Sequence, residues 1–139
     1  MRKLSDIVLN QTPLTLTKSA TVKDACHQMC ARHAGSVLVV NEHGHLEGIF
    51  TGRDAVYRVL ALGKNAATTK LADVMTAGPE TMPPEKSAID ALRLMWDGGF
   101  RHVPVVKAGK LIGVVSRGDF KAAEHDRLEE ERSLWEHMR

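Results

Sequence analysis

The pattern of apolar and polar positions occurs twice along the chain. Residues 21–24 carry the Thr-x-x-Asp spacing of a capping box, and the apolar residues after them follow the spacing of a half-buried helix. The short apolar run Ser36–Val40, rich in β-branched residues, predicts a buried strand. The same order returns with Ser-x-x-Asp at 87–90 and the apolar run Val103–Val106. Agreement in order, spacing and residue type predicts an internal duplication.

Each copy is expected to contain an extended segment, a helix, two strands joined by a turn, and a second helix. The first copy is expected to have an extended segment at 13–16, a helix from 21, strands at 36–40 and 45–50, and a helix at 54–62. The second is expected to have an extended segment at 79–82, a helix from 87, strands at 103–106 and 111–115, and a helix from about 119 towards the C-terminus. These elements predict an α/β (α+β) fold.

The boundaries follow from the same comparison. The lead-in Lys3–Ile7 matches Lys70–Val74. The expected divisions are residues 1–63 for the first repeat, 64–69 for a linker, 70–123 for the second repeat and 124–139 for a helical tail. The tail carries charges at i, i+4 spacing and a partial apolar stripe. A solvated terminal helix and a helix docked on a partner subunit both stay open.

Composition narrows the class of protein. The chain has 139 residues, 4% of them aromatic, and a net charge of +2. Few aromatic residues and no basic stripe make nucleic acid an unlikely partner. The N-terminus lacks the apolar run of a signal peptide, and no apolar stretch approaches membrane-spanning length, so we expect a cytoplasmic protein that does not bind membranes.

The two cysteines lie one helical turn apart in the first repeat. Cys26 and Cys30 share the apolar face of the expected helix, so both are expected to be reduced core residues. A metal site that adds His27 and His33 is disfavoured, because His27 points away from the cysteines on a helix. No metal ligands are therefore expected.

One motif occupies the same place in both copies. It reads Gly-Ile-Phe-Thr-Gly-Arg-Asp at 48–54 and Gly-Val-Val-Ser-Arg-Gly-Asp at 113–119. In each, a strand ends at a hydroxyl residue and a helix begins near the aspartate. Free N–H groups at the helix start, the hydroxyl and the arginine suit a phosphate, and the carboxylate suits a ribose. The same spacing also suits a capping box with no ligand, and both interpretations stay open.

The repeats resemble CBS domains, named for cystathionine β-synthase, which occur as tandem pairs. The doubled motif carries the resemblance, together with His102–Val106 and Leu71–Thr76, over about residues 3–123. The resemblance implies two β-α-β-β-α repeats packed with pseudo-two-fold symmetry. It also implies adenosine-containing ligands in clefts between the repeats, and frequent dimers.

The resemblance implies the site residues as well. Asp54 and Asp119 would hold ribose, and Thr51 and Ser116 would hold phosphate. The full candidate nucleotide site comprises Thr15, Ser36, Val37, Thr51, Arg53, Asp54, Thr81, Arg101, His102, Val103, Pro104, Ser116, Arg117 and Asp119. The first repeat departs from the pattern, with Leu38 where the second has Pro104 and Gly35-Ser36 where it has Arg101-His102.

These observations favour a regulatory module over an enzyme. The first hypothesis is an energy- or redox-sensing CBS pair that binds AMP, ADP, ATP or NAD, requires no cofactor, and acts on a separate regulated protein or by self-association. The alternative is a structural or protein-interaction module whose motifs only cap helices. An enzyme is disfavoured because no acid, base and nucleophile converge.

Two further expectations concern association and affinity. A homodimer is expected through an apolar face that includes Val56, Val59 and Leu60, and the tail, with Trp135, is expected to contribute to association and not to ligand binding. The second-repeat site is expected to bind a phosphorylated ligand more tightly than the first, because the second repeat adds Arg101 and His102 to its own motif.

Overall fold

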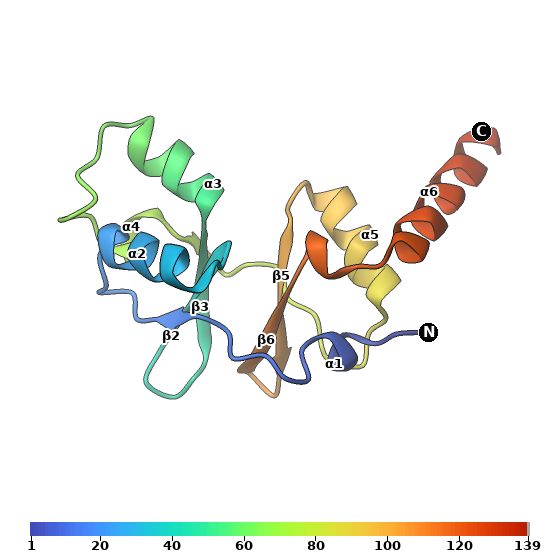
Figure 1. The fold of residues 1–139 in the computed structure, drawn as a ribbon, viewed down its shortest axis with the longest axis horizontal. Coiled ribbons are helices and arrows are strands. Elements are labelled where there is room, and N and C mark those ends of the chain that lie inside the picture. Colours follow the sequence, from blue (N-terminus) through green and yellow to red (C-terminus); the bar gives the residue numbers. More distant parts are fainter. Residues whose placement is uncertain (139) are drawn as a thin grey trace.

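The computed structural model describes residues 1–138 as two similar halves that lie side by side (Figure 1). The first half contains β1 (Thr15–Leu16), α2 (Val22–Arg32), β2 (Ser36–Val40), β3 (Leu46–Thr51), α3 (Gly52–Asp54) and the π-helical segment η1 (Ala55–Leu60). The second contains α5 (Ala88–Gly98), β5 (His102–Lys107), β6 (Lys110–Ser116), the 3₁₀ turn η2 (Arg117–Asp119) and α6 (Ala122–His137). Each half is preceded by a short lead-in: α1 (Leu4–Ile7) for the first, α4 (Leu71–Val74) with β4 (Thr76–Ala77) for the second.

Corresponding strands pair in the same way in the two halves. β2 pairs antiparallel with β3, so that Ser36 lies opposite Thr51. β5 pairs antiparallel with β6, so that His102 lies opposite Ser116. The first sheet has the order β1-β2-β3-β4, whereas the second is the two-stranded β5-β6 sheet, joined at one parallel bridge by Met82. The mixed α/β fold and the expected order of elements are confirmed.

Each lead-in packs into the core of the half that it does not precede in sequence, so the lead-ins are exchanged between the halves. Leu4 and Val8 belong to the core formed by α5, β5 and β6, while Leu71 and Val74 belong to the core formed by α2, β2 and β3. Figure 1 shows the N-terminal segment starting beside the second half and crossing to the first. Each half therefore has a core completed by a segment that the sequence comparison placed with the other half.

Two glycines leave room for the exchanged lead-ins to pack. A Cβ on Gly48 would lie 2.5 Å from Sδ of Met75, and one on Gly113 would lie 2.6 Å from Cβ of Val8. Both distances are below any ordinary contact, so each lead-in packs against bare backbone. In the second half the Gln11 side-chain amide exchanges two hydrogen bonds with the backbone of Val114, at 2.8 and 3.0 Å.

The structure corrects the expected C-terminal helix. Only the short turn η2 follows the second motif, and Phe120 then adopts an extended backbone (φ −89°, ψ 144°). Its ring is buried in the second core, so α6 starts anew at Ala122. The first half of α6 packs on α5 through the buried Leu128, while Leu134 and Trp135 are exposed. The docked part of α6 therefore lies against its own chain.

Two smaller expectations also need correction. Cys30 is exposed and Cys26 only half-buried, because α2 turns Val22, Ala25 and Met29 towards the core instead. Val59 is buried, so it is not part of an exposed association face. The apolar residues exposed on and after η1 are Val56, Tyr57, Leu60 and Leu62.

Candidate functional site: a cleft at the first motif

The first motif folds as a capping box at the start of α3. The Thr51 hydroxyl accepts a hydrogen bond from the Asp54 amide at 3.3 Å, and Asp54 Oδ2 accepts from the Thr51 amide at 2.9 Å and from its hydroxyl at 3.2 Å. Asp54 Oδ1 faces the Arg58 Nε at 3.5 Å. Because each carboxylate oxygen has two lone pairs, Oδ1 keeps capacity for another donor. Capping and ligand binding are thus compatible at this residue.

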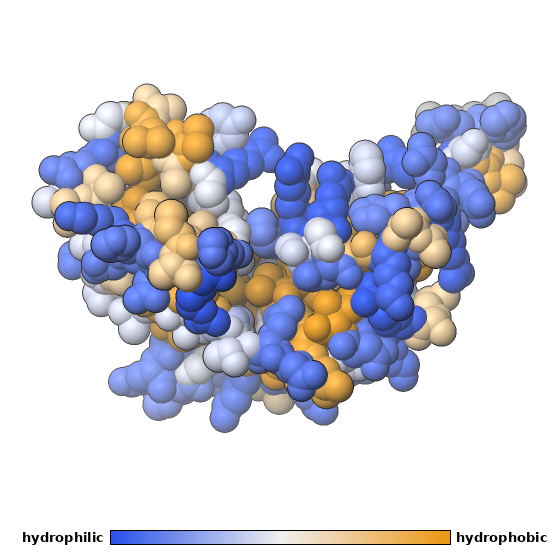
Figure 2. All heavy atoms as spheres, in the orientation of Figure 1, coloured by the Kyte–Doolittle hydropathy of each residue, from blue (hydrophilic) through white to orange (hydrophobic). Residues whose placement is uncertain are grey.

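A cavity of about 850 Å³ opens beside this capping box. It lies between the two halves, where the surface is hollowed (Figure 2). Its lining comprises Gly35, Ile49, Thr51, Gly52, Arg53, Asp54, Tyr57, Thr76, Gly78, Pro79, Glu80, Phe100, Arg101 and His102. The volume falls within the range of small-molecule sites, about 300–1,000 Å³.

Positive charge enters this cavity from both halves. Arg53 extends from α3, stacks over Tyr57 at 5.2 Å and donates to the Gly99 carbonyl at 3.4 Å. Arg101 and His102 come from the start of β5. A position with two guanidinium groups near a helix start favours an anionic group.

His102 packs closely at the junction of the halves. Its Nε2 lies 3.1 Å from where a Cβ on Gly35 would stand, so the glycine leaves room for the ring. Burial lowers the pKa of His102, the Asp119 carboxylate opposes this shift, and the Arg101 charge adds to it. The net result is a pKa below the ordinary value, which favours the neutral ring at pH 7.

The second motif has the same capping box and different surroundings. Asp119 Oδ2 accepts from the Ser116 amide at 2.7 Å and from its hydroxyl at 3.2 Å. The Arg117 guanidinium lies over the Trp96 ring at 4.4 Å, and Arg132 of α6 lies over the same ring at 5.0 Å. Within residues 1–138, neither the cleft nor a smaller cavity of about 290 Å³ beside Trp96 is lined by the second motif.

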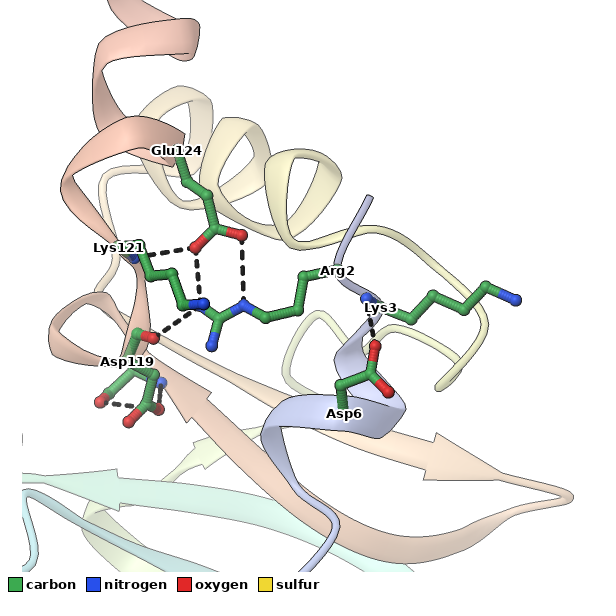
Figure 3. A network of polar contacts seen from close by, with 7 residues as sticks. Arg2, Lys3, Asp6, Asp119, Lys121 and Glu124 are labelled. Carbon is green, nitrogen blue, oxygen red and sulfur yellow. Dashed lines mark hydrogen bonds and ion pairs between the residues drawn. The ribbon is translucent and has the colours of Figure 1, made fainter.

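The N-terminus is tied to this second motif. Arg2 donates to Glu124 at 2.6 and 3.3 Å and to the Asp119 carbonyl at 2.9 Å (Figure 3). Partial burial raises the pKa of Glu124, but hydrogen bonds from Arg2 and the Lys121 amide outweigh it and hold the pKa below its usual range. The first turn of α6 is therefore held by charge as well as by packing.

The structure brings together five of the candidate residues, Thr51, Arg53, Asp54, Arg101 and His102, in the cleft. The other candidates lie outside its lining: Thr15 and Thr81 are exposed, Ser36, Val37, Val103 and Pro104 are buried in strands, and Ser116, Arg117 and Asp119 form the second motif. Arg101 and His102 lie beside the second motif as expected, because His102 is opposite Ser116 and the Arg101 carbonyl accepts from the Arg117 amide. They also line the cavity of the first motif, which was not expected.

Sequence reasoning missed the segment Thr76–Glu80 and the aromatic residues Tyr57 and Phe100 as lining residues. Thr76 is the last residue of the segment Leu71–Thr76 that carries the family resemblance, which was a signal that the segment is structurally important. Its place in the cleft follows from the pairing of β4 with β3, and short-range patterns do not reveal that pairing.

The family model for the CBS domain matches residues 4–61 and 71–126. This chain belongs to the CBS domain family. The two matches correspond to the two halves, so the structure is that of a CBS pair, with one cleft described between its repeats.

Three similar proteins support this assignment. The Arabidopsis thaliana "CBS domain-containing protein CBSX3, mitochondrial" is 37% identical over 84% of this chain and 59% of its own length. A protein with CBS domains from Burkholderia ambifaria has a TM-score of 0.79 at 32% identity, covering 84% of this chain and 89% of the other. A CBS domain protein from Pyrobaculum aerophilum, complexed with AMP, has a TM-score of 0.81 at 22% identity, covering 92% and 98%.

The chain spans less than two thirds of the length of the curated relatives that it matches. It covers 59% of the plant protein named above and 18–19% of several other Arabidopsis proteins. Within residues 1–138, the structure has no helix that is both long and apolar enough to cross a membrane. The same residues contain no group of three or more His, Cys, Asp or Glu side chains arranged to hold a metal ion.

Proposed function

We propose that this CBS pair is a regulatory module that binds AMP, or a related nucleotide such as ADP, ATP or NAD, in the cleft at the first motif. The observation that carries the proposal is a cavity of about 850 Å³ whose lining combines a helix start, two arginines and a carboxylate. CBS pairs are generally regulatory or binding modules. Occupancy of the cleft would act on a separate partner protein or on self-association.

The chemistry of the lining suggests a role for each group. The α3 start with Thr51, together with Arg53 and Arg101, suits a phosphate, because charged donors bind anions more strongly than neutral ones. Asp54 Oδ1 suits the ribose hydroxyls. Ile49 and the neighbouring apolar lining suit the flat faces of a base.

The residues exposed around η1 support association of two chains. Val56, Tyr57, Leu60 and Leu62 are each at least 50% exposed, and Figure 2 shows apolar surface gathered at that end of the first half. Interfaces between permanent subunits are more apolar than ordinary surface. We therefore propose a homodimer through this face, with Val59 contributing only from beneath.

A calorimetric titration tests the binding proposal. AMP is expected to bind at least about tenfold more tightly than adenosine, because hydrogen bonds to a charged group contribute about 1.5–3 kcal/mol. Arg101→Ala should remove most of that difference while leaving adenosine affinity within about twofold. Lys107→Ala, at the exposed far end of the strand β5 that follows Arg101, is the matched control and should leave both affinities unchanged.

One observation favours a second function. Both motifs form capping boxes, which account for the motifs without any ligand. In that case the pair is a structural or protein-interaction module. The same titration separates the two: saturable AMP binding that depends on Arg101 supports the nucleotide module, whereas no binding at millimolar AMP supports the interaction module.

A further inference from the structure

The two motifs differ in the order of one pair of residues. The first reads Thr51-Gly52-Arg53-Asp54, and the second reads Ser116-Arg117-Gly118-Asp119. The backbone places Gly52 and Arg117 at equivalent positions, since the Gly52 amide donates to the Gly35 carbonyl and the Arg117 amide donates to the Arg101 carbonyl. The arginine of each motif therefore leaves the backbone from a different position.

The partner of Arg117 is also specific to the second repeat. Trp96 stands in the α5 stripe where Cys30 stands in the stripe of α2. The Arg117 guanidinium lies 4.4 Å from the centroid of the Trp96 ring, and Arg132 from α6 lies 5.0 Å from the same centroid. One indole ring thus joins the second motif, α5 and α6.

The Arg117 side chain is partly buried in this arrangement. Its Nε is buried and has no hydrogen-bond partner among residues 1–138. A phosphate in solution does not reach that nitrogen while the guanidinium lies on Trp96. Arg53, in contrast, lines the open cleft.

We propose that the second motif anchors helix α6 through Arg117 and Trp96 instead of holding a nucleotide, so that each chain binds a single nucleotide at the first motif. The anchoring part is argued from the contacts of Arg117 and does not depend on the proposed function. The single-nucleotide part rests on the proposed function. Other contacts share the anchoring, namely the Arg93–Glu131 ion pair at 2.7 Å and the buried Leu128.

The anchoring part is tested without any nucleotide. Amide hydrogen exchange of the α6 segment 125–137 is measured in the whole protein and in Arg117→Ala. Loss of the stacking contact should speed exchange by about three- to thirtyfold, which corresponds to the range measured for cation–π contacts. Arg32→Ala removes an arginine from α2 of the first repeat, outside both motifs, and should leave α6 exchange unchanged.

Arg117→Lys distinguishes the stack from a plain charge effect. It keeps the positive charge and loses the planar guanidinium, so its α6 exchange should fall between those of the wild type and Arg117→Ala. Exchange in Arg117→Ala equal to that of the wild type would overturn the proposal.

The stoichiometry of AMP binding tests the second part. One AMP per chain at saturation is expected, and two per chain would overturn the single-site proposal. Absence of AMP binding would refute the proposed function, and the hydrogen-exchange result would then still decide whether the second motif anchors α6.

Discussion

The motifs of the two repeats form the same capping box, but the residues around the two capping boxes differ. Beside Asp54 the chain leaves a cavity of about 850 Å³, with Arg53 in its lining. Beside Asp119 the neighbouring Arg117 lies on Trp96, and Arg2 reaches the Asp119 carbonyl. A shared motif therefore predicts a shared helix start, and the surroundings determine what that helix start can bind.

The difference arises from the order of glycine and arginine within the motif and from residues outside the motif. Gly35 leaves room for the His102 ring, and the strand starts of both repeats converge on one side. The two repeats have similar frameworks and differ at single positions, such as Cys30 in the stripe of α2 and Trp96 in the stripe of α5. The following predictions test this comparison, starting with the largest expected effect.

The exchanged lead-ins should be equally important to both repeats. Leu4→Ala and Leu71→Ala each empty a fully buried site in the core of the opposite repeat and should each lower the free energy of unfolding by about 2–5 kcal/mol. Urea denaturation measures this loss. Leu9→Ala, at a 76% exposed position, is the control and should change stability by less than about 0.5 kcal/mol. A small effect of Leu71→Ala would contradict the observed packing.

Reversing the order of glycine and arginine in the first motif should weaken AMP binding in the cleft while the fold is kept. The double change Gly52→Arg and Arg53→Gly gives the first motif the order of the second. A Cβ on Gly52 meets no atom within 4 Å, so the fold should tolerate it. AMP affinity should fall at least about tenfold, or 1.4 kcal/mol, because a bulky side chain then borders the cavity. Unchanged affinity in calorimetry would show that the residue order does not distinguish the motifs.

The smallest predicted effect concerns pH. Burial lowers the pKa of His102 in the folded protein, with Asp119 opposing and Arg101 reinforcing the shift. The folded state then binds fewer protons than the unfolded state, so His102 reduces stability as the pH falls below the ordinary histidine pKa of about 6.5. His102→Gln should therefore lose less stability than the wild type between pH 7.5 and 5.5 in urea denaturation. His27→Gln gives the effect of the same substitution at an exposed histidine, and a steeper loss in His102→Gln would contradict the prediction.

Local sequence rules predicted what depends on neighbouring residues. The N-cap at Thr21, the capping box at Ser87, the buried strand β2 and the duplication of the whole order were all predicted from spacing. At Thr21 only the hydroxyl half of the expected box forms, because the Asp24 amide donates to the Thr21 hydroxyl without a return bond to the Asp24 carboxylate. These features depend on hydrogen bonds three residues apart and on the burial of one apolar run.

The features that sequence did not predict depend on contacts between distant segments. The exchange of lead-ins rests on packing at Gly48, and the break before α6 rests on the burial of Phe120 in a distant core. Arg101 was assigned to its own motif, where its carbonyl accepts from the Arg117 amide, but the sequence did not reveal that Arg101 also lines the cleft at the first motif. Periodicity within one repeat carries no information on how two repeats meet.

The central claim is that the nucleotide binds at the first motif and not at the second. Its most direct test is calorimetric titration of AMP into Asp54→Ala and Asp119→Ala. Each variant loses the N3 carboxylate of a capping box, so the two are matched at that contact. The account predicts that Asp54→Ala weakens AMP binding at least about tenfold while Asp119→Ala keeps it within about twofold, with one site per chain. Loss of binding in Asp119→Ala together with wild-type affinity in Asp54→Ala would contradict it.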